Sequence, residues 1–246
     1  MLDLVRYPSP VGNLAAYVSP QTSDGSRRPA IVWLVGGFAN SIGPSAWEPA
    51  PRHDDQSARA FREAGVVLML PSLRGGNDNP GERETLYGEV DDVLAARDWL
   101  VRQPNVDPDR IYLGGHSTGG TLALLVAETT DKFRAVIAFG PVANAASYSG
   151  HRPLLANAHE ARVRSPIHFM ETIRTPTFIV EGSDSPNAGD VQQLASAAAG
   201  APVKSYTIQG GSHFSILAPI TELLATKILA DDIDLTDAGL NAAFAR

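Results

Sequence analysis

The sequence predicts an α/β protein, with a mostly parallel sheet of eight strands and helices on both faces of the sheet. Short runs rich in β-branched and aromatic residues alternate with longer helix-like segments, which is the order expected for such a sheet. At 246 residues the chain has the length of one large α/β domain, so we expect a single domain over residues 1–246. Hydrophobic residues make up 43% and charged residues 19% of the sequence, which is typical of a folded globular protein.

Apolar runs and the residues that interrupt them assign the elements of the N-terminal half. Two short strand-like segments should form a hairpin, and a polar loop over 21–28 follows them. The first helix ends at Gly65, a common helix stop, and the strand after it ends at Pro71. The predicted strands span 2–6, 13–18, 30–35 and 66–70, and the predicted helices span 56–64 and 85–103.

The C-terminal half continues the alternation of strands and helices. A turn around Pro108 leads into a strand, and the apolar helix directly after that strand begins near Thr118. The last residues form a weak helix, with Thr236 or Asp237 as its N-cap. The predicted strands span 110–113, 135–139, 177–180 and 203–208, and the predicted helices span 118–130, 191–199, 214–230 and 235–246.

One interval, residues 141–175, lacks this regularity. It connects two predicted strands and contains His151, His159 and His168. A connection of this length at the carboxyl edge of a sheet often covers a binding site. We therefore expect a small lid-like insertion here, although an ordinary crossover helix with surface loops fits the sequence equally well.

Charge and cysteine content exclude several classes of function. The chain has 20 lysines and arginines against 27 aspartates and glutamates, and this net charge of −7 argues against nucleic acid or an anionic membrane as partner. There is no cysteine, so disulfides, thiolate catalysis and cysteine-ligated zinc are excluded. The N-terminal residues do not resemble a secretory signal, and no apolar run reaches the ~20 residues of a membrane span. We expect a cytoplasmic protein that uses no metal or other cofactor.

The most informative segment is IYLGGHSTGGT, residues 111–121, where a strand-like run passes through a Gly-x-Ser-x-Gly turn into an apolar helix. This layout places Ser117 on a sharp strand-to-helix bend, with its hydroxyl exposed above the sheet. The glycines at 115 and 119 permit an unusual backbone angle and close packing of the helix on the strand. The N–H of Thr118, at the helix start, faces the same space. A turn of this kind predicts a nucleophilic serine.

Three segments resemble the prolyl oligopeptidase-like branch of the α/β-hydrolases. They are VDPDRIYLGGHSTGG at 106–120, the arginine–glycine loop LPSLRGG at 70–76, and the helix start GEVDDV at 88–93. The likeness extends from about residue 30 to about residue 230. It implies an α/β-hydrolase fold, with a serine, an acid and a histidine that act together and follow one another in that order along the chain.

A serine hydroxyl barely ionises at neutral pH, so as a nucleophile it needs a base to take its proton. In the family that this chain resembles, the base is a histidine late in the chain. His213, in the segment GGSHF after the last predicted strand, has that position and is the candidate base. His116, beside the serine, is expected to pack around the bend. His53 lies in a charged loop whose residue spacing matches no known metal site.

The third member should be an acid that follows the strand at 177–180 and orients the histidine. Asp184 is the first choice because it lies in the loop beyond the strand end. Its spacing departs from the Gly-x-x-Asp common in the family, since this aspartate comes one residue sooner after Gly182. Glu181, at the strand end, is therefore an alternative, and Asp190 is a more distant one.

Two backbone N–H groups should stabilise the oxyanion of the tetrahedral intermediate. Thr118 supplies one of them. The other is expected from the glycine-rich loop after the strand at 30–35, where Phe38 is favoured and Gly37 is the alternative. Arg74, in the arginine–glycine loop, is expected to brace neighbouring loops rather than to contact substrate.

The leading hypothesis is a serine hydrolase that cleaves carboxylic esters of small molecules, through an acyl-enzyme on Ser117 with His213 as base. Peptidases of the related branch typically carry a large N-terminal propeller, for which this chain has no room, so an ester is favoured over a peptide. A small peptidase or acyl-peptide hydrolase that acts on short peptides is the alternative. The third hypothesis is a non-catalytic hydrolase-fold protein that binds a ligand.

Overall fold

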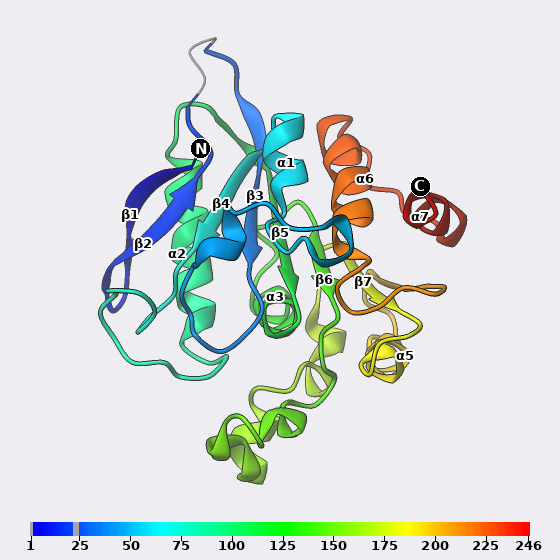
Figure 1. Ribbon diagram of the computed structural model, residues 1–246. Coiled ribbons are helices and arrows are strands. Elements are labelled where there is room, and N and C mark those ends of the chain that lie inside the picture. Colours follow the sequence, from blue (N-terminus) through cyan, green and yellow to red (C-terminus); the bar gives the residue numbers. More distant parts are fainter. Residues whose placement is uncertain (1, 22–24) are drawn as a thin grey trace.

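The computed structural model describes residues 2–21 and 25–246, and its strands form one eight-stranded sheet (Figure 1). The strands are β1 (Asp3–Ser9), β2 (Gly12–Val18), β3 (Arg28–Leu34), β4 (Val67–Pro71), β5 (Val106–His116), β6 (Val136–Phe139), β7 (Thr177–Gly182) and β8 (Val203–Ile208). Their order in the sheet is β1-β2-β4-β3-β5-β6-β7-β8. β2 pairs antiparallel with both β1 and β4, and the other neighbouring strands are parallel. The predicted class, a mostly parallel eight-stranded α/β sheet, is confirmed.

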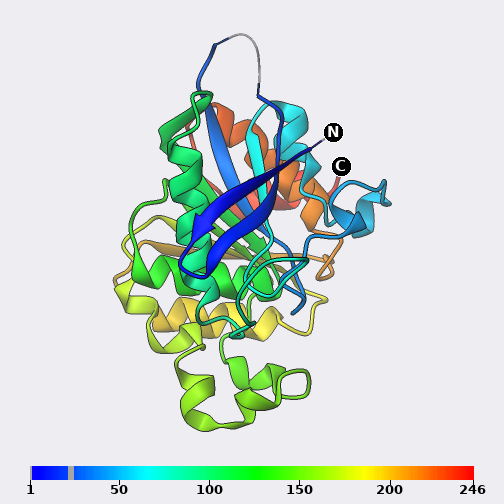
Figure 2. The same cartoon turned by 90° about the vertical axis from the view of Figure 1, so that its left-hand side faces the viewer.

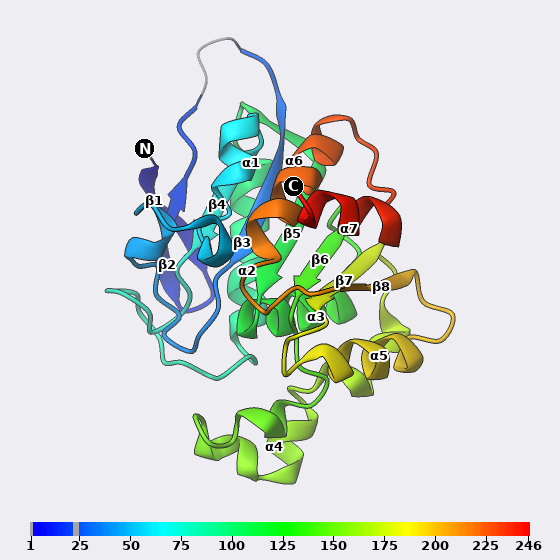
Figure 3. The same ribbon diagram turned by 45° about the vertical axis from the view of Figure 1, so that its right-hand side comes forward.

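Helices cover both faces of this sheet (Figure 3). They are α1 (Arg59–Ala64), α2 (Glu89–Val101), α3 (Thr118–Thr129), α4 (Ala158–Arg162), α5 (Ala188–Ala197), α6 (Leu217–Leu229) and α7 (Asp237–Phe244). α2, α3 and α5 pack on one face, and α1, α6 and α7 on the other. Along β3 the side chains alternate between the two cores, with Val32 in the first and Ile31 and Trp33 in the second. A strand buried on both faces reads as a continuous apolar run, which is why β3 was predictable.

Helix α2 begins at Glu89, later than the predicted start at residue 85. The Glu89 carboxylate accepts hydrogen bonds from the backbone N–H groups of Glu84, Thr85 and Tyr87. Thr85 and Leu86 have φ values of +58° and +68°, outside the helical region. The Glu89 side chain thus gives these N–H groups an acceptor. Residues 85–88 form a non-helical turn, whereas the apolar pattern alone predicts that they belong to the helix.

The remaining differences are shifts at element ends. β5 is longer than predicted, because the turn around Pro108 is part of a strand whose first residue, Val106, pairs with Arg28. The polar loop predicted over 21–28 lies partly outside the described residues, and its last residue already belongs to β3. α7 has Thr236 as its N-cap, with the Thr236 side chain accepting from the Gly239 N–H.

Between β6 and β7 the chain leaves the sheet and projects from the rest of the molecule (Figures 1 and 2). This segment consists of α4 and of 3-10 turns at Ala145–Tyr148, Pro153–Ala156, Pro166–His168 and Met170–Thr172. It starts at the carboxyl end of β6, which lies directly beside β5 in the sheet. The segment therefore begins next to the strand end that carries Ser117.

Candidate active site

Ser117 lies at the bend between β5 and α3. Its φ and ψ are +58° and −120°, a conformation rarely adopted by residues other than glycine. α3 approaches β3 so closely that a Cβ on Gly119 would lie 2.2 Å from the Leu34 carbonyl oxygen. Glycine is therefore required there for the bend to form, as the Gly-x-Ser-x-Gly pattern predicts.

Ser117 and His213 line the same cavity, which has a volume of about 540 Å³. Thr118 and the predicted oxyanion residues Gly37 and Phe38 line it as well. The rest of its wall comes from the segment between β6 and β7 and from two later loops, and consists of Ser147, Tyr148, His151, Pro186, Asn187 and Phe214. Residues that the sequence places far apart are thus brought to one space.

The acid that contacts His213 is Glu181. Its Oε2 lies 2.8 Å from His213 Nδ1, and its Oε1 accepts the Gly182 N–H at 2.8 Å. Glu181 has no exposed surface, and it lies in β7, all of whose residues are buried. This carboxylate is held by two hydrogen bonds and can accept the Nδ1–H of the imidazole, which leaves Nε2 free to take a proton.

The first choice for the acid, Asp184, is wrong as a partner of His213. Asp184 is exposed, and its Oδ1 accepts the hydroxyl of Ser183 at 2.9 Å. β7 continues through Gly182, and the turn after it directs Asp184 to the surface instead of towards the imidazole. Asp190, the more distant alternative, accepts the Ala143 N–H at 2.8 Å and belongs to the first turn of α5.

Gly140, at the end of β6, makes room for the acid–imidazole pair. Its φ is +55°, and a Cβ there would lie 2.2 Å from Glu181 Oε2 and 2.4 Å from His213 Cε1. A side chain at this position would therefore displace both groups. The sequence reading missed this residue; its signal is a single glycine directly after a short buried strand.

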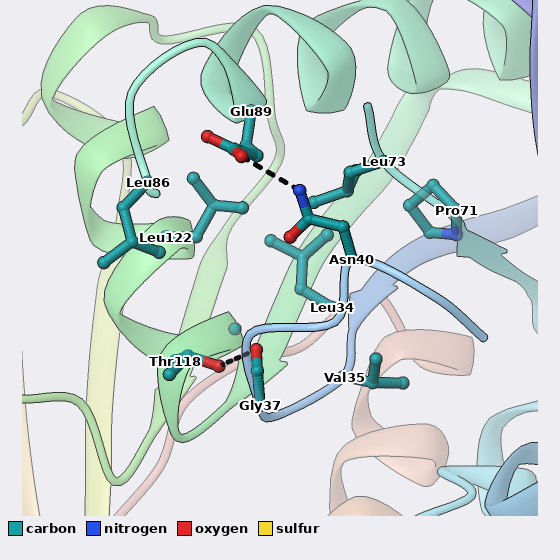
Figure 4. A pocket seen from close by; sticks show the side chains of 11 residues that line it. Leu34, Val35, Gly37, Asn40, Pro71, Leu73, Leu86, Glu89, Thr118 and Leu122 are labelled. Atoms are coloured by element: carbon teal, nitrogen blue, oxygen red, sulfur yellow. Dashed lines mark hydrogen bonds between the residues drawn. The ribbon is translucent and has the colours of Figure 1, made fainter. Parts of the chain in front are cut away.

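Several contacts anchor the loop that follows β3. Thr118 Oγ1 donates to the Gly37 carbonyl at 2.7 Å (Figure 4). The peptide bond between Gly37 and Phe38 is trans, so its N–H points in the direction opposite to its carbonyl. The Phe38 N–H therefore points away from Thr118 Oγ1. The Asn40 side chain donates to Glu89 and to the Arg74 carbonyl, both at 2.9 Å. Figure 4 shows a small cavity, of about 30 Å³, between these anchors.

The segment between β6 and β7 also contacts this loop. The Tyr148 ring meets the Phe38 ring edge-on, with 5.0 Å between centroids. Arg152 donates to the Phe38 carbonyl, and its guanidinium carbon lies 5.0 Å from the centre of the Phe38 ring. The Tyr148 hydroxyl lies 3.1 Å from Thr121 Oγ1, which donates to the Ser117 carbonyl. No sequence pattern points to these contacts of Tyr148 and Arg152, because both depend on how an irregular segment folds back.

His116 packs directly against His213, the candidate base. It is buried, its Nε2 lies 3.0 Å from the His213 carbonyl oxygen, and the two ring centroids are 4.4 Å apart. Burial, together with the nearby charge of His213, lowers the pKa of His116 to about 3. The ring is therefore neutral at physiological pH, and its Nε2–H donates to the backbone of His213.

Of the other residues singled out in the sequence, Arg74, His53, His159 and His168 lie outside this cavity. Arg74 is buried and pairs with Asp92 at 2.9 Å, so it braces loops as expected. His53 is exposed, and in the described part of the chain no group of three potential ligands has the arrangement of a metal site. His159 and His168 do not line the cavity, whereas His151 does. Among residues 2–21 and 25–246, no helix has the length and apolar character needed to span a bilayer.

Comparisons with known proteins agree with the fold. An uncharacterized protein of Mycobacterium tuberculosis is 27% identical over 221 residues, which cover 87% of this chain and 75% of that protein. An acylaminoacyl peptidase of Pyrococcus horikoshii superposes with a TM-score of 0.75 at 14% identity, covering 98% of this chain and 44% of that chain. An esterase of Pyrobaculum calidifontis superposes with a TM-score of 0.68 at 18% identity, covering 94% of this chain and 86% of that chain. The chain thus spans less than half of the peptidase and most of the esterase.

A sequence model of the prolyl oligopeptidase family matches residues 52–188 of this chain. The matched region is more than half of the 246 residues and contains Ser117 and Glu181. It also covers the arginine–glycine loop and the nucleophile region on which the resemblance was based. The chain therefore belongs to the prolyl oligopeptidase family of serine hydrolases.

Proposed function

We propose that the protein hydrolyses carboxylic esters through an acyl-enzyme on Ser117. His213 is the general base and Glu181 is the acid that orients it. The backbone N–H groups of Thr118 and Phe38 form the oxyanion hole, with Gly37 as the alternative to Phe38. The hydrogen bond between Glu181 and His213, in the wall of the cavity that Ser117 lines, is the observation that carries the proposal.

The reaction proceeds in two halves. Ser117 Oγ attacks the substrate carbonyl while His213 Nε2 takes the hydroxyl proton, and the oxyanion forms hydrogen bonds with the two backbone N–H groups. The intermediate then collapses, and the leaving alcohol takes the proton from His213. Water, deprotonated by His213, attacks the acyl-enzyme, releases the carboxylic acid and restores Ser117.

Before substrate enters, Ser117 Oγ makes no hydrogen bond with any residue that the structure describes. The contact between Ser117 and His213 is therefore expected to form in the complex, by rotation of the serine side chain about its Cα–Cβ bond. Such catalytic hydrogen bonds are often long or unformed in free enzymes.

The lining of the cavity favours an uncharged acyl group. Its wall contains the aromatic side chains of Phe38, Tyr148, His151 and Phe214, and no carboxylate among the described residues. A free peptide amino terminus is cationic and would find no negative partner there. We propose that residues 141–175 act as a lid-like insertion, since Tyr148 and His151 lie in the wall.

A second candidate function is the hydrolysis of peptides with a blocked amino terminus. The same aromatic wall favours it, since blocking removes the charge that the cavity does not neutralise. An acylaminoacyl peptidase is also among the proteins with a similar fold. For such a substrate His213 would protonate a leaving amine rather than an alcohol.

Labelling and turnover together test the proposal. A fluorophosphonate probe should label the wild type and leave Ser117→Ala unlabelled. The wild type should hydrolyse p-nitrophenyl acetate faster than acetyl-aminoacyl anilides, and both faster than aminoacyl anilides with a free amino group. A preference for the acetylated anilides would replace the ester proposal by the blocked-peptide one. A folded wild type that the probe does not label would favour a non-catalytic binding protein.

A further inference from the structure

A second cavity, of about 590 Å³, lies away from Ser117. Its wall is built from the start of α2, the end of α3 and part of the segment between β6 and β7. Ser117 precedes the first residue of α3, whereas Glu128 in the cavity wall is near the last. At 1.5 Å per helical residue, the two positions are about 16 Å apart along the helix. The cavity is therefore separate from the proposed catalytic site.

Glu128 is the unusual residue of this cavity. Its Oε1 is out of contact with solvent and has no hydrogen-bond partner among the described residues. Burial, and then the negative charge of Glu171, raise the pKa of the Glu128 carboxyl to about 9. Buried polar atoms in folded proteins nearly always have a partner, so a buried carboxyl oxygen without one in a cavity wall requires an explanation.

The charges around the cavity favour a cation over an anion. Besides Glu128, the carboxylates of Glu84 and Asp91 belong to its wall. Arg74 is the one cationic side chain of the described wall, and each of its three guanidinium nitrogens already donates to a carboxylate, to Asp92 at 2.9 and 3.1 Å and to Glu84. An anionic ligand would therefore meet several carboxylates and no free cationic donor.

Arg164 lies next to the cavity but does not alter this balance. It donates to Glu160 and to the backbone carbonyls of Glu84 and Thr85, and its guanidinium carbon lies 5.0 Å from the centre of the Tyr87 ring. Its donors are thus engaged, and none is left for a ligand in the cavity.

The rest of the wall is apolar. Leu86 lines the cavity from the turn before α2, Val90 from α2, Leu125 from α3, and Val163 and Phe169 from the segment between β6 and β7. Tyr87, which is largely exposed, forms part of the rim. A ligand that fits must therefore combine one charged group with a hydrophobic body.

We propose that this cavity binds an amphiphilic organic ammonium ion, with its nitrogen paired to Glu128 and its apolar body against Leu125 and Phe169. The free protein holds Glu128 protonated near neutral pH. Binding of the cation favours the carboxylate, so the carboxyl proton leaves to solvent and one proton is released for each ligand bound. The ammonium and carboxylate form no covalent bond.

Calorimetry with 2-phenylethylammonium as the probe tests this site. Titration at pH 7 in phosphate and in Tris, which differ in heat of ionisation, should show binding with release of close to one proton. 2-Phenylethanol and 3-phenylpropanoate should bind much more weakly, because neither carries the positive charge. Loss of one charge-assisted hydrogen bond corresponds to a decrease in affinity of about tenfold or more.

Two variants separate this site from the catalytic one. Glu128→Gln keeps the shape of the side chain and should lose most of the affinity and all of the proton release, whereas Glu63→Gln, at an exposed position of α1, should bind as the wild type does. Ser117→Ala and fluorophosphonate-labelled protein should also bind normally, so the result does not depend on whether the ester proposal holds. Absence of binding at millimolar probe, equal binding by Glu128→Gln, or loss of binding after labelling would each overturn the proposal.

Discussion

Glu181 and Asp184 are only three residues apart in the sequence, but they differ in burial and in hydrogen bonding, the two properties that matter for an acid beside an imidazole. Glu181 is fully buried at the end of a central strand, and the Gly182 N–H holds one of its oxygens while the other faces His213. Asp184 is exposed, and its Oδ1 accepts the hydroxyl of Ser183. A buried and hydrogen-bonded carboxylate fixes both the ring orientation and the tautomer of the histidine.

A matched pair of variants follows from this difference. Glu181→Gln should lower kcat for p-nitrophenyl acetate by roughly a thousandfold or more, because an amide can donate to Nδ1 and stabilise the wrong tautomer. Asp184→Asn should leave kcat within about twofold, as expected for an exposed side chain away from the reaction. Steady-state kinetics of both variants, with folding checked by circular dichroism, make the comparison. A larger decrease in kcat for Asp184→Asn than for Glu181→Gln would indicate that Asp184 is the acid that orients His213.

Ser117 and His213, which the structure brings to one cavity, could be singled out from the sequence because each lies in a local pattern with a physical reason. Ser117 needs glycines around a strained bend, and His213 lies between a glycine pair and a helix. The acid has no comparable pattern. Which of two nearby carboxylates faces the imidazole depends on where β7 ends, and a shift of one or two residues at a strand end is beyond what apolar periodicity determines.

At the scale of elements, the two loops that build the site depend on each other. The loop after β3 supplies Phe38, and the segment between β6 and β7 holds that residue through Tyr148 and Arg152. A second arginine, Arg83, also donates to the Phe38 carbonyl, at 3.3 Å. The position of one proposed oxyanion donor therefore depends on a segment that contributes no proposed catalytic residue.

Replacement of Arg152 tests that dependence. Arg152→Ala should lower kcat for an oxoester about tenfold, with little change in KM, because a less ordered Phe38 N–H stabilises the oxyanion less well. The loss should be smaller for the matching thionoester, since sulfur accepts hydrogen bonds weakly and gains less from the hole. Arg162→Ala, in the same segment but not bonded to Phe38, is the control and should behave as the wild type does. Equal losses for both esters would indicate a structural role alone.

The elements themselves were predictable wherever packing sets the pattern. Strands buried on both faces appeared as apolar runs, and their ends shifted by only a few residues in the structure. The start of α2 was not predictable in this way. There the Glu89 carboxylate accepts backbone N–H groups of the preceding turn, so a side chain decides where the helix begins.

At the scale of the whole molecule, the chain has more acidic than basic residues, and several of its carboxylates are buried. The net charge is −7, and most carboxylates that the structure buries have a partner: Glu181 pairs with His213, and Asp92 with Arg74. Glu128, which is partly exposed, differs from them, since its buried Oε1 has no hydrogen-bond partner in the described part of the chain. The free energy of unfolding should therefore depend on pH through the Glu128 carboxyl, because its pKa differs between the folded and the unfolded state.

The sign of that contribution follows from the raised pKa of Glu128, which is about 9 in the folded protein against an ordinary value of 4.5. Between these two pH values the unfolded chain binds fewer protons at this residue than the folded one, so the free energy of unfolding falls as pH rises. Glu128→Gln removes this pH-dependent decrease in the free energy of unfolding, because glutamine does not titrate. Wild type and variant should therefore have nearly equal midpoints of thermal unfolding at pH 4, and the variant should be increasingly more stable up to about pH 9. Thermal unfolding of both proteins across that range measures the difference, in which the titrations of other groups largely cancel. A difference that does not change with pH would show that the pKa of Glu128 is the same in the folded and the unfolded state.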